Sequence, residues 1–120
     1  MVLQHATIPS PSAPPSEDRV EVMRRLTDKI LAAFNHAYAV GETAIADRLR
    51  EILAFVESAR NERGDTHDAY DPLAQAETWV EFVKARNHYK WICENRRNDP
   101  AGAADALAAM KEAYRRWSLS

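Results

Sequence analysis

The sequence predicts an all-α protein of four helices that form two antiparallel αα-hairpins, packed either as a four-helix bundle or as a short helical-repeat-like array. Three observations predict this fold class. Gly occurs only three times in 120 residues, whereas Ala, Arg and Glu, which favour helices, are abundant. Apolar residues recur at intervals of three and four along four segments, as they do on one face of a helix. Short stretches with Gly, Asn, Asp or Pro separate these segments.

The composition indicates a single domain with room for a modest apolar core. Hydrophobic residues make up 46% of the chain and charged residues 28%, both near the average for globular domains. The net charge of −2 argues against a generally basic nucleic-acid-binding surface, although it allows a local basic patch. The single cysteine, Cys93, excludes an internal disulfide. Because we find no secretory signal and no apolar run of about 18 residues, we expect a cytoplasmic protein.

Residues 1–15 are rich in Pro and Ser and offer few apolar groups to bury, so we expect a flexible tail there. A single helical domain should follow over residues 16–120. Its first helix is predicted over residues 17–40, with Ser16 as the N-cap and Gly41 at its end. One apolar stripe runs along this helix and consists of Val20, Met23, Leu26, Ile30, Phe34, Ala37 and Tyr38.

The second helix is predicted over residues 42–63 and ends at Gly64. Its apolar stripe consists of Ile45, Leu49, Ile52, Leu53, Val56 and Ala59. The link at Gly41 is so short that the first two helices should form an antiparallel hairpin. The segment AYAVGETAIA, residues 37–46, resembles the inter-helix turn of tetratricopeptide repeats, with a Gly followed five residues later by a small Ala. Phe34 stands where that repeat has a small residue, and no period of about 34 residues reappears, so we interpret the likeness as a shared way of packing a helical hairpin.

The third and fourth helices are predicted over residues 72–97 and 100–117. The loop GDTHDAYDP precedes the third helix, with Asp71 as the expected N-cap and Pro72 as the first helical residue. Asp99, which also precedes a proline, separates the two helices and is the expected N-cap of the fourth. The apolar stripe of the fourth helix consists of Ala103, Leu107, Met110, Tyr114 and Trp117.

We find no set of residues typical of an enzyme or a metal site. Counted from Asp65, an EF-hand loop would need Gly where Tyr70 stands and Glu where Ala76 stands. The four histidines are scattered over different segments, so none of them predicts a zinc site. Carboxylate pairs one turn apart, such as Glu77 and Glu81, are typical of solvated charged faces. We therefore predict a protein that is not an enzyme and holds no metal or cofactor.

The third helix has apolar residues on two faces. On a helical wheel at about 100° per residue, the expected core stripe consists of Phe82, Ala85, Tyr89, Ile92 and Cys93. Cys93 is expected to be buried and inert, because free cysteines are among the most often buried residues. The second apolar face lies on nearly the opposite side of the helix and consists of Leu73, Val80 and Trp91.

Two interpretations of this second face are open. In one, the third helix is central and packs against neighbours on both sides. In the other, the second face is exposed and binds a partner protein, since Trp, Tyr and Arg dominate binding hot spots. We favour a small interaction module (an adaptor, regulator or complex subunit) that binds a protein partner, or a second copy of itself, through the third helix. The expected contact residues are Trp79, Arg86, Lys90, Trp91 and Arg97.

A nucleic-acid-binding regulator is the alternative function. Residues 84–97 carry five basic residues against one acid, and Trp91 or Tyr89 could stack on a base. No recognised nucleic-acid-binding motif is present. Acidic residues just upstream would repel a phosphate backbone, and they are Asp65, Asp68, Asp71, Glu77 and Glu81. Because of these acids we rank nucleic acid below a protein partner.

Overall fold

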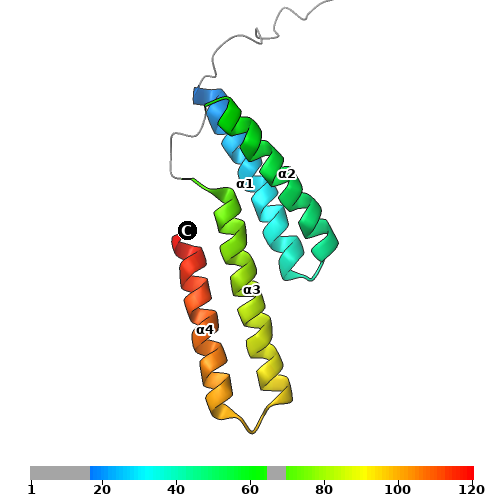
Figure 1. The fold of residues 1–120 in the computed structure, drawn as a ribbon, viewed down its shortest axis with the longest axis vertical. Helices are drawn as coiled ribbons and strands as arrows, with labels where there is room; N and C mark the ends of the chain where they lie inside the picture. The colour runs from blue at the N-terminus through cyan, green and yellow to red at the C-terminus, as the bar shows by residue number, and fades with distance from the viewer. Residues whose placement is uncertain (1–16, 65–69) are drawn as a thin grey trace, which may run out of the picture.

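The computed structural model describes residues 17–64 and 70–120 and shows the predicted all-α fold (Figure 1). Its helices are α1 (Glu17–Ala39), α2 (Thr43–Glu62), α3 (Pro72–Asn95) and α4 (Pro100–Leu119). Each helix begins and ends within two residues of its predicted bounds. The tail predicted over residues 1–15 lies outside the described residues.

Gly41 ends α1 and turns the chain into α2. Its φ of +88° lies in the left-handed region, which residues with a Cβ rarely adopt. The N–H of Gly41 donates to the carbonyl oxygen of Tyr38 at 3.1 Å, and the N–H of Glu42 donates to that of Ala37 at 2.9 Å. These two bonds satisfy carbonyl groups that the end of a helix leaves free. As a result α2 returns antiparallel to α1, and we call this pair hairpin 1.

Helices α3 and α4, which we call hairpin 2, both begin with an aspartate N-cap followed by a proline. Asp71 accepts a hydrogen bond from the backbone N–H of Ala74 at 3.1 Å, and Asp99 accepts one from that of Gly102 at 2.9 Å. A proline occupies the first helical position after each aspartate, where its missing N–H costs no hydrogen bond. The N-caps predicted at Asp71 and Asp99 are therefore confirmed, whereas the one predicted at Ser16 lies outside the described residues.

The main apolar core lies in hairpin 1, where the first half of α3 covers it. Its buried residues are Leu31, Phe34, Ala37, Ala46, Leu53 and Ala76. Three stripe positions predicted in hairpin 1 are wrong, because Leu26, Ile45 and Ile52 are exposed, and Tyr114 in the predicted stripe of α4 is exposed as well. The predicted position Leu53 is buried, and α2 also buries Ala46, which was not predicted; both are 0% exposed. A small side chain such as alanine at this position lets two helices approach closely, which sets the rotation of α2.

Helix α3 lies between hairpin 1 and α4. On one side Leu73 and Val80 pack against the core of hairpin 1. On the other side the ring of Phe82 lies 5.5 Å from that of Tyr114 in α4, measured between centroids. Within the described residues, α4 packs closely against α3 and against no other helix. The helices thus form an open layer (Figure 1), which is the array-like one of the two predicted arrangements.

The two hairpins are staggered along the long axis of the molecule (Figure 1). Helix α3 begins beside α1 and runs past the turn at Gly41, so that its last residues and the start of α4 extend beyond hairpin 1. Arg86 marks the end of the contact, because its guanidinium reaches the carbonyl oxygen of Ala39 at the end of α1. We call residues 87–109, which lie past this point, the distal end of hairpin 2.

Candidate interaction surface

Two of the five predicted contact residues, Trp79 and Arg86, join the hairpins to each other. The indole N–H of Trp79 donates to the carbonyl oxygen of Asn35 in α1 at 2.8 Å, and the Trp79 ring lies 4.7 Å from that of Trp117 in α4. Arg86 donates to the carbonyl oxygen of Ala39 at 3.1 Å. That carbonyl belongs to the last turn of α1, where carbonyl groups lack partners within the helix. Both side chains therefore have contacts within the chain.

The other three predicted contact residues, Lys90, Trp91 and Arg97, are exposed at the distal end. Trp91 leaves 48% of its surface open. The guanidinium of Arg96 lies 5.5 Å from the centroid of the Trp91 ring, within the range of a cation–π contact. Within the described residues Lys90 and Arg97 make no ion pair, and the acid nearest to them along α3 is the exposed Glu94.

Trp91 belongs to the same face of α3 that packs against hairpin 1. It follows Leu73 by about five helical turns and Val80 by about three, so the three side chains lie in one line along the helix. Hairpin 1 covers Leu73 and Val80, whereas Trp91 lies past the end of α1. Of the two interpretations of this face, packing of α3 against neighbours on both sides holds for its first half. In its second half this face is open.

The paired carboxylates of α3 are used to contact its neighbours. Glu77 forms an ion pair with Arg50 of α2 at 3.0 Å, and Glu81 forms one with Arg116 of α4 at 3.7 Å. All four side chains are well exposed, so each pair adds at most about 1 kcal/mol. The two glutamates thus join α3 to α2 on one side and to α4 on the other.

Cys93 is exposed, so the prediction that it is buried is wrong. On the helical wheel it falls between the face of α3 that meets α4 and the face turned toward hairpin 1, and no helix covers this interval at the distal end. Ile92 takes the inward position, with 8% of its surface exposed. A hydrogen bond between Tyr89 and Cys93, together with the charge of the thiolate, raises the pKa of Tyr89.

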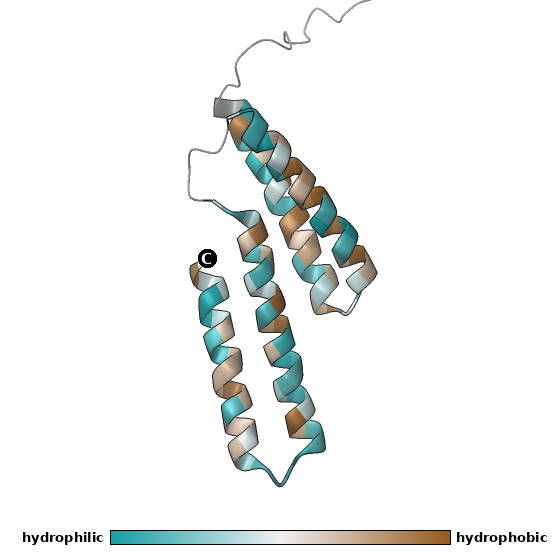
Figure 2. Cartoon of the chain, in the orientation of Figure 1, coloured by the Kyte–Doolittle hydropathy of each residue, from teal (hydrophilic) through white to brown (hydrophobic). Residues whose placement is uncertain are grey.

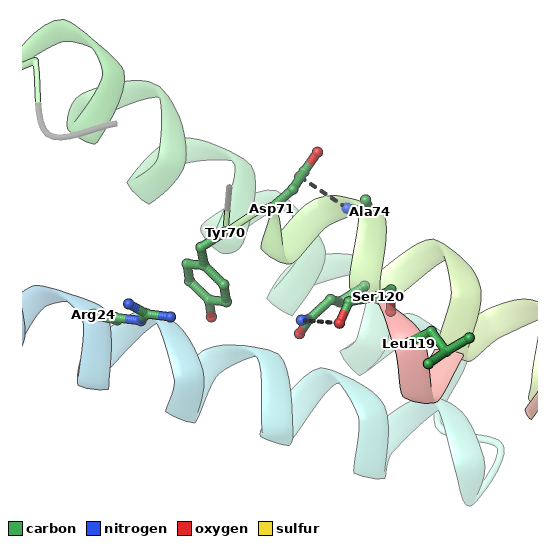
Figure 3. Close-up of a pocket in the computed structure, with 7 residues that line it drawn as sticks. Arg24, Tyr70, Asp71, Ala74, Leu119 and Ser120 are labelled. Carbon is green, nitrogen blue, oxygen red and sulfur yellow. Dashed lines mark hydrogen bonds between the residues drawn. The ribbon is translucent and has the colours of Figure 1, made fainter. Parts of the chain in front are cut away.

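A hollow of about 610 Å³ lies where α1, the start of α3 and the end of α4 meet (Figure 3). Tyr70 points from the segment before α3 toward α1, where its hydroxyl donates to Asp28 and the Arg24 guanidinium lies 4.7 Å from its ring centroid. Burial and the Asp28 carboxylate raise the pKa of Tyr70. On the other wall the Gln75 amide donates to the carbonyl oxygen of Ser120 at 3.2 Å. These contacts tie the three helices together. Sequence reasoning missed Tyr70 because it treated this segment as a solvated loop.

Within the described residues, no three His, Cys, Asp or Glu side chains gather closely enough to hold a metal ion. Asp71, one of the acids considered for a metal loop, caps α3 through its carboxylate. Asp65, His67 and Asp68 lie outside the described residues.

The chain matches no protein-family model, no curated protein and no solved structure. Among the described helices none is both long enough and apolar enough to span a membrane, and Figure 2 shows hydrophilic residues along each of them. The interpretation of function therefore depends on the surfaces of this molecule.

Proposed function

We propose that this chain is a small protein-interaction module, an adaptor, regulator or complex subunit, that binds a protein partner or a second copy of itself through the distal part of α3. One observation carries the proposal. The face of α3 that packs against hairpin 1 continues past it and presents Trp91, which is 48% exposed. A tryptophan offers a large, stiff apolar surface at little entropic cost, which is why it is enriched in binding hot spots. A partner docked here would extend the packing that hairpin 1 makes upstream.

Basic residues around Trp91 define the charge of the surface that would meet it. Lys90 and Arg97 are exposed in the same segment as Trp91, and Arg96 lies over the indole ring. Cations at the margin of an apolar contact orient an incoming surface and speed its association. We therefore expect the partner to offer carboxylates around an apolar pocket. Trp79 and Arg86 are left out of this surface because contacts between the hairpins occupy them.

Affinity capture from the native cell tests the proposal. Wild type, Trp91→Ala and the control Lys111→Ala, an exposed position on α4, are used side by side. We expect wild type and Lys111→Ala to recover the same partner and Trp91→Ala to lose it while keeping its helical circular dichroism spectrum. Sedimentation velocity of the same three proteins tests pairing with a second copy. If Trp91→Ala recovers the partner or dimerises as wild type does, this surface is not the interface.

The exposed cations also support nucleic acid as a second candidate. Lys84, Lys90, Arg96 and Arg97 lie within a few turns of Trp91, and all four are exposed. Arg96 lies over one face of the indole, so a base would have to stack on the other face. Titration with labelled single strands at two salt concentrations decides between the candidates, because phosphate contacts weaken steeply with salt. Binding that is salt-sensitive and lost in Trp91→Ala would favour nucleic acid.

A further inference from the structure

Hairpin 1 has an apolar face turned away from α3, and we propose that it docks an acidic amphipathic helix of a partner protein. Five large apolar side chains on α1 and α2 are exposed, and they are Val22, Leu26, Ile45, Ile52 and Phe55. We call them the outer face. Phe55 is 74% exposed. Burying a side chain of this size is worth about 1.5–3 kcal/mol, so their joint exposure marks a surface that gains by being covered.

The α1 part of the outer face lies opposite the side that meets α3. With Phe34 set at zero on the helical wheel, Val22 and Leu26 fall at about 240° and 280°. Asn35, whose carbonyl oxygen accepts the hydrogen bond from Trp79 of α3, falls at about 100°. Roughly half a turn therefore separates the two sides.

The α2 part of the outer face also lies opposite the side that meets α3. With Leu53 set at zero, Ile45 and Ile52 fall at about 260–280° and Phe55 at about 200°. Arg50, which pairs with Glu77 of α3, falls at about 60°. The apolar rows of both helices thus lie on one side of hairpin 1, and α3 lies on the other.

The two rows lie on the outer side of the α1–α2 pair, where a third helix can pack. Packed helices lie about 8–10 Å apart, and the furrow between two of them accepts the side chains of a third. Helix α3 occupies the corresponding furrow on the opposite side and contacts both α1 and α2. On the outer side, a hollow of about 340 Å³ is lined by Val22, Arg25, Leu26 and Lys29.

Basic residues flank both apolar rows of the outer face. Lys29 and Arg48 both fall at about 220° on their helices, beside the apolar rows. Neither makes an ion pair within the described residues, and both are exposed. Arg25 is also exposed and pairs only loosely with Glu21, at 3.6 Å. Among residues 19–62, the acids nearest the apolar rows are Glu62 and Glu51, at about 180° and 160°, which lie beyond Phe55 on the side of α2 turned away from α1.

These charges indicate which kind of helix would bind to the outer face. Helix α3 shows what fits such a furrow, because it sets Leu73 and Val80 on the core and Glu77 against Arg50. A partner helix with apolar residues every three or four positions and Asp or Glu at its flanks would meet Lys29 and Arg48 in the same way. A symmetric pair formed by this chain would instead bring the same mainly basic margins toward each other.

Binding of a synthetic peptide to the full chain, followed by fluorescence anisotropy, tests the proposal. The probe is a helical peptide as long as α2, which has 20 residues, with Leu along one stripe and Glu on its flanks. A matched peptide carries Lys in place of Glu. We expect the acidic peptide to bind and the basic one not to bind. Phe55→Ser should weaken binding by about tenfold or more, and added salt should also weaken it.

Charge reversal gives an independent readout. The double variant Lys29→Glu, Arg48→Glu should lose the acidic peptide and gain the basic one, because the sign of the margin has changed. Trp91→Ala should bind the acidic peptide as wild type does, so failure at this face is distinguishable from failure at the distal end. Because Phe55 is exposed, Phe55→Ser should keep its circular dichroism spectrum and thermal midpoint.

Three outcomes would overturn the proposal. Binding of neither peptide, or of both peptides equally, would show that the face does not select an acidic helix. Binding to phosphatidylserine vesicles that is lost in Phe55→Ser, without binding of the peptide, would assign the face to a lipid surface. A sedimentation coefficient of a dimer that falls to that of a monomer in Phe55→Ser would assign the face to a second copy.

Discussion

Trp79 of α3 donates its indole N–H to the backbone carbonyl oxygen of Asn35 in α1, at 2.8 Å. The same side chain lies 4.7 Å from Trp117 of α4, measured between ring centroids. This one residue of α3 thus contacts both α1 and α4. Trp91, three turns further along α3, contacts neither hairpin 1 nor an aromatic residue of α4 among the described contacts.

Replacement of Trp79 and of Trp91 should therefore lower the free energy of unfolding by different amounts. Trp79→Ala should lower the free energy of unfolding by about 3 kcal/mol, because it removes an aromatic group between two helices. Trp79→Phe, which loses the hydrogen bond and keeps most of the packing, should cost about 1–2 kcal/mol. Trp91→Ala should cost about 0.5 kcal/mol. Urea denaturation followed by circular dichroism measures all three, and similar losses for Trp79→Ala and Trp91→Ala would contradict the assignment of the surface.

The rotation of α2 predicts a second contrast, between neighbouring residues. Leu53 is 0% exposed, so Leu53→Ala should cost about 3–5 kcal/mol through lost burial and the cavity left behind. Ile52 is exposed, and Ile52→Ala should cost about 1 kcal/mol or less. Thermal and urea unfolding of the two variants measure the difference. A larger loss for Ile52→Ala would mean that α2 has the opposite rotation.

The sequence predicted where the helices begin and end because those signals are local. Gly41 and Gly64 end α1 and α2 with positive φ, and Asp71 and Asp99 cap α3 and α4. The rotation of α2 was missed because it depends on contacts with another helix. The apolar pattern placed both Ile52 and Leu53 in the core, whereas the structure buries Leu53 with Ala46 and leaves Ile52 exposed.

Two other differences from prediction arise in the same way. The buried side of α2 also includes Arg60, which is 3% exposed and pairs with Glu57 at 3.3 Å, and a charged residue is not recognised as core from sequence. The division of the α3 contact residues into Trp79, which is covered, and Trp91, which is open, follows from the stagger of the hairpins. That stagger depends on where α1 stops relative to α3, and periodicity along α3 carries no information about it.

The raised pKa of Tyr70 predicts a loss of stability at alkaline pH. Burial and the Asp28 carboxylate favour the neutral phenol in the folded state. Its contribution should be complete below the unfolded-state pKa of about 10 and should be lost as the pH rises toward the higher folded-state value. The advantage of wild type over Tyr70→Phe in urea midpoint should therefore shrink above pH of about 10. Asp28→Asn should reduce this pH dependence. Parallel pH profiles for wild type and Tyr70→Phe would argue against the contact.

Exposure of Cys93 predicts a thiol that reacts in the folded protein. A maleimide or a disulfide reagent should label it in native buffer at a rate within severalfold of that in urea. The matched control moves the thiol by one position, with Ile92→Cys in a Cys93→Ser background. Because Ile92 is buried, the relocated thiol should react at least about tenfold more slowly than Cys93 does. Equal protection of both thiols would mean that another element covers Cys93.

The open arrangement of the helices also means that some helices depend on others for their packing more than the reverse. Helix α4 packs closely on α3 alone, α3 needs hairpin 1 for its first half, and hairpin 1 keeps most of its core within itself. Opening of α4 would expose Phe82 and one side of Trp79 without disturbing Leu53 or Phe34. Amide hydrogens should therefore exchange fastest in α4, more slowly in the first half of α3 and slowest in hairpin 1. The contacts within each hairpin are close in sequence, so each can form early, and the interface between them completes the folded state.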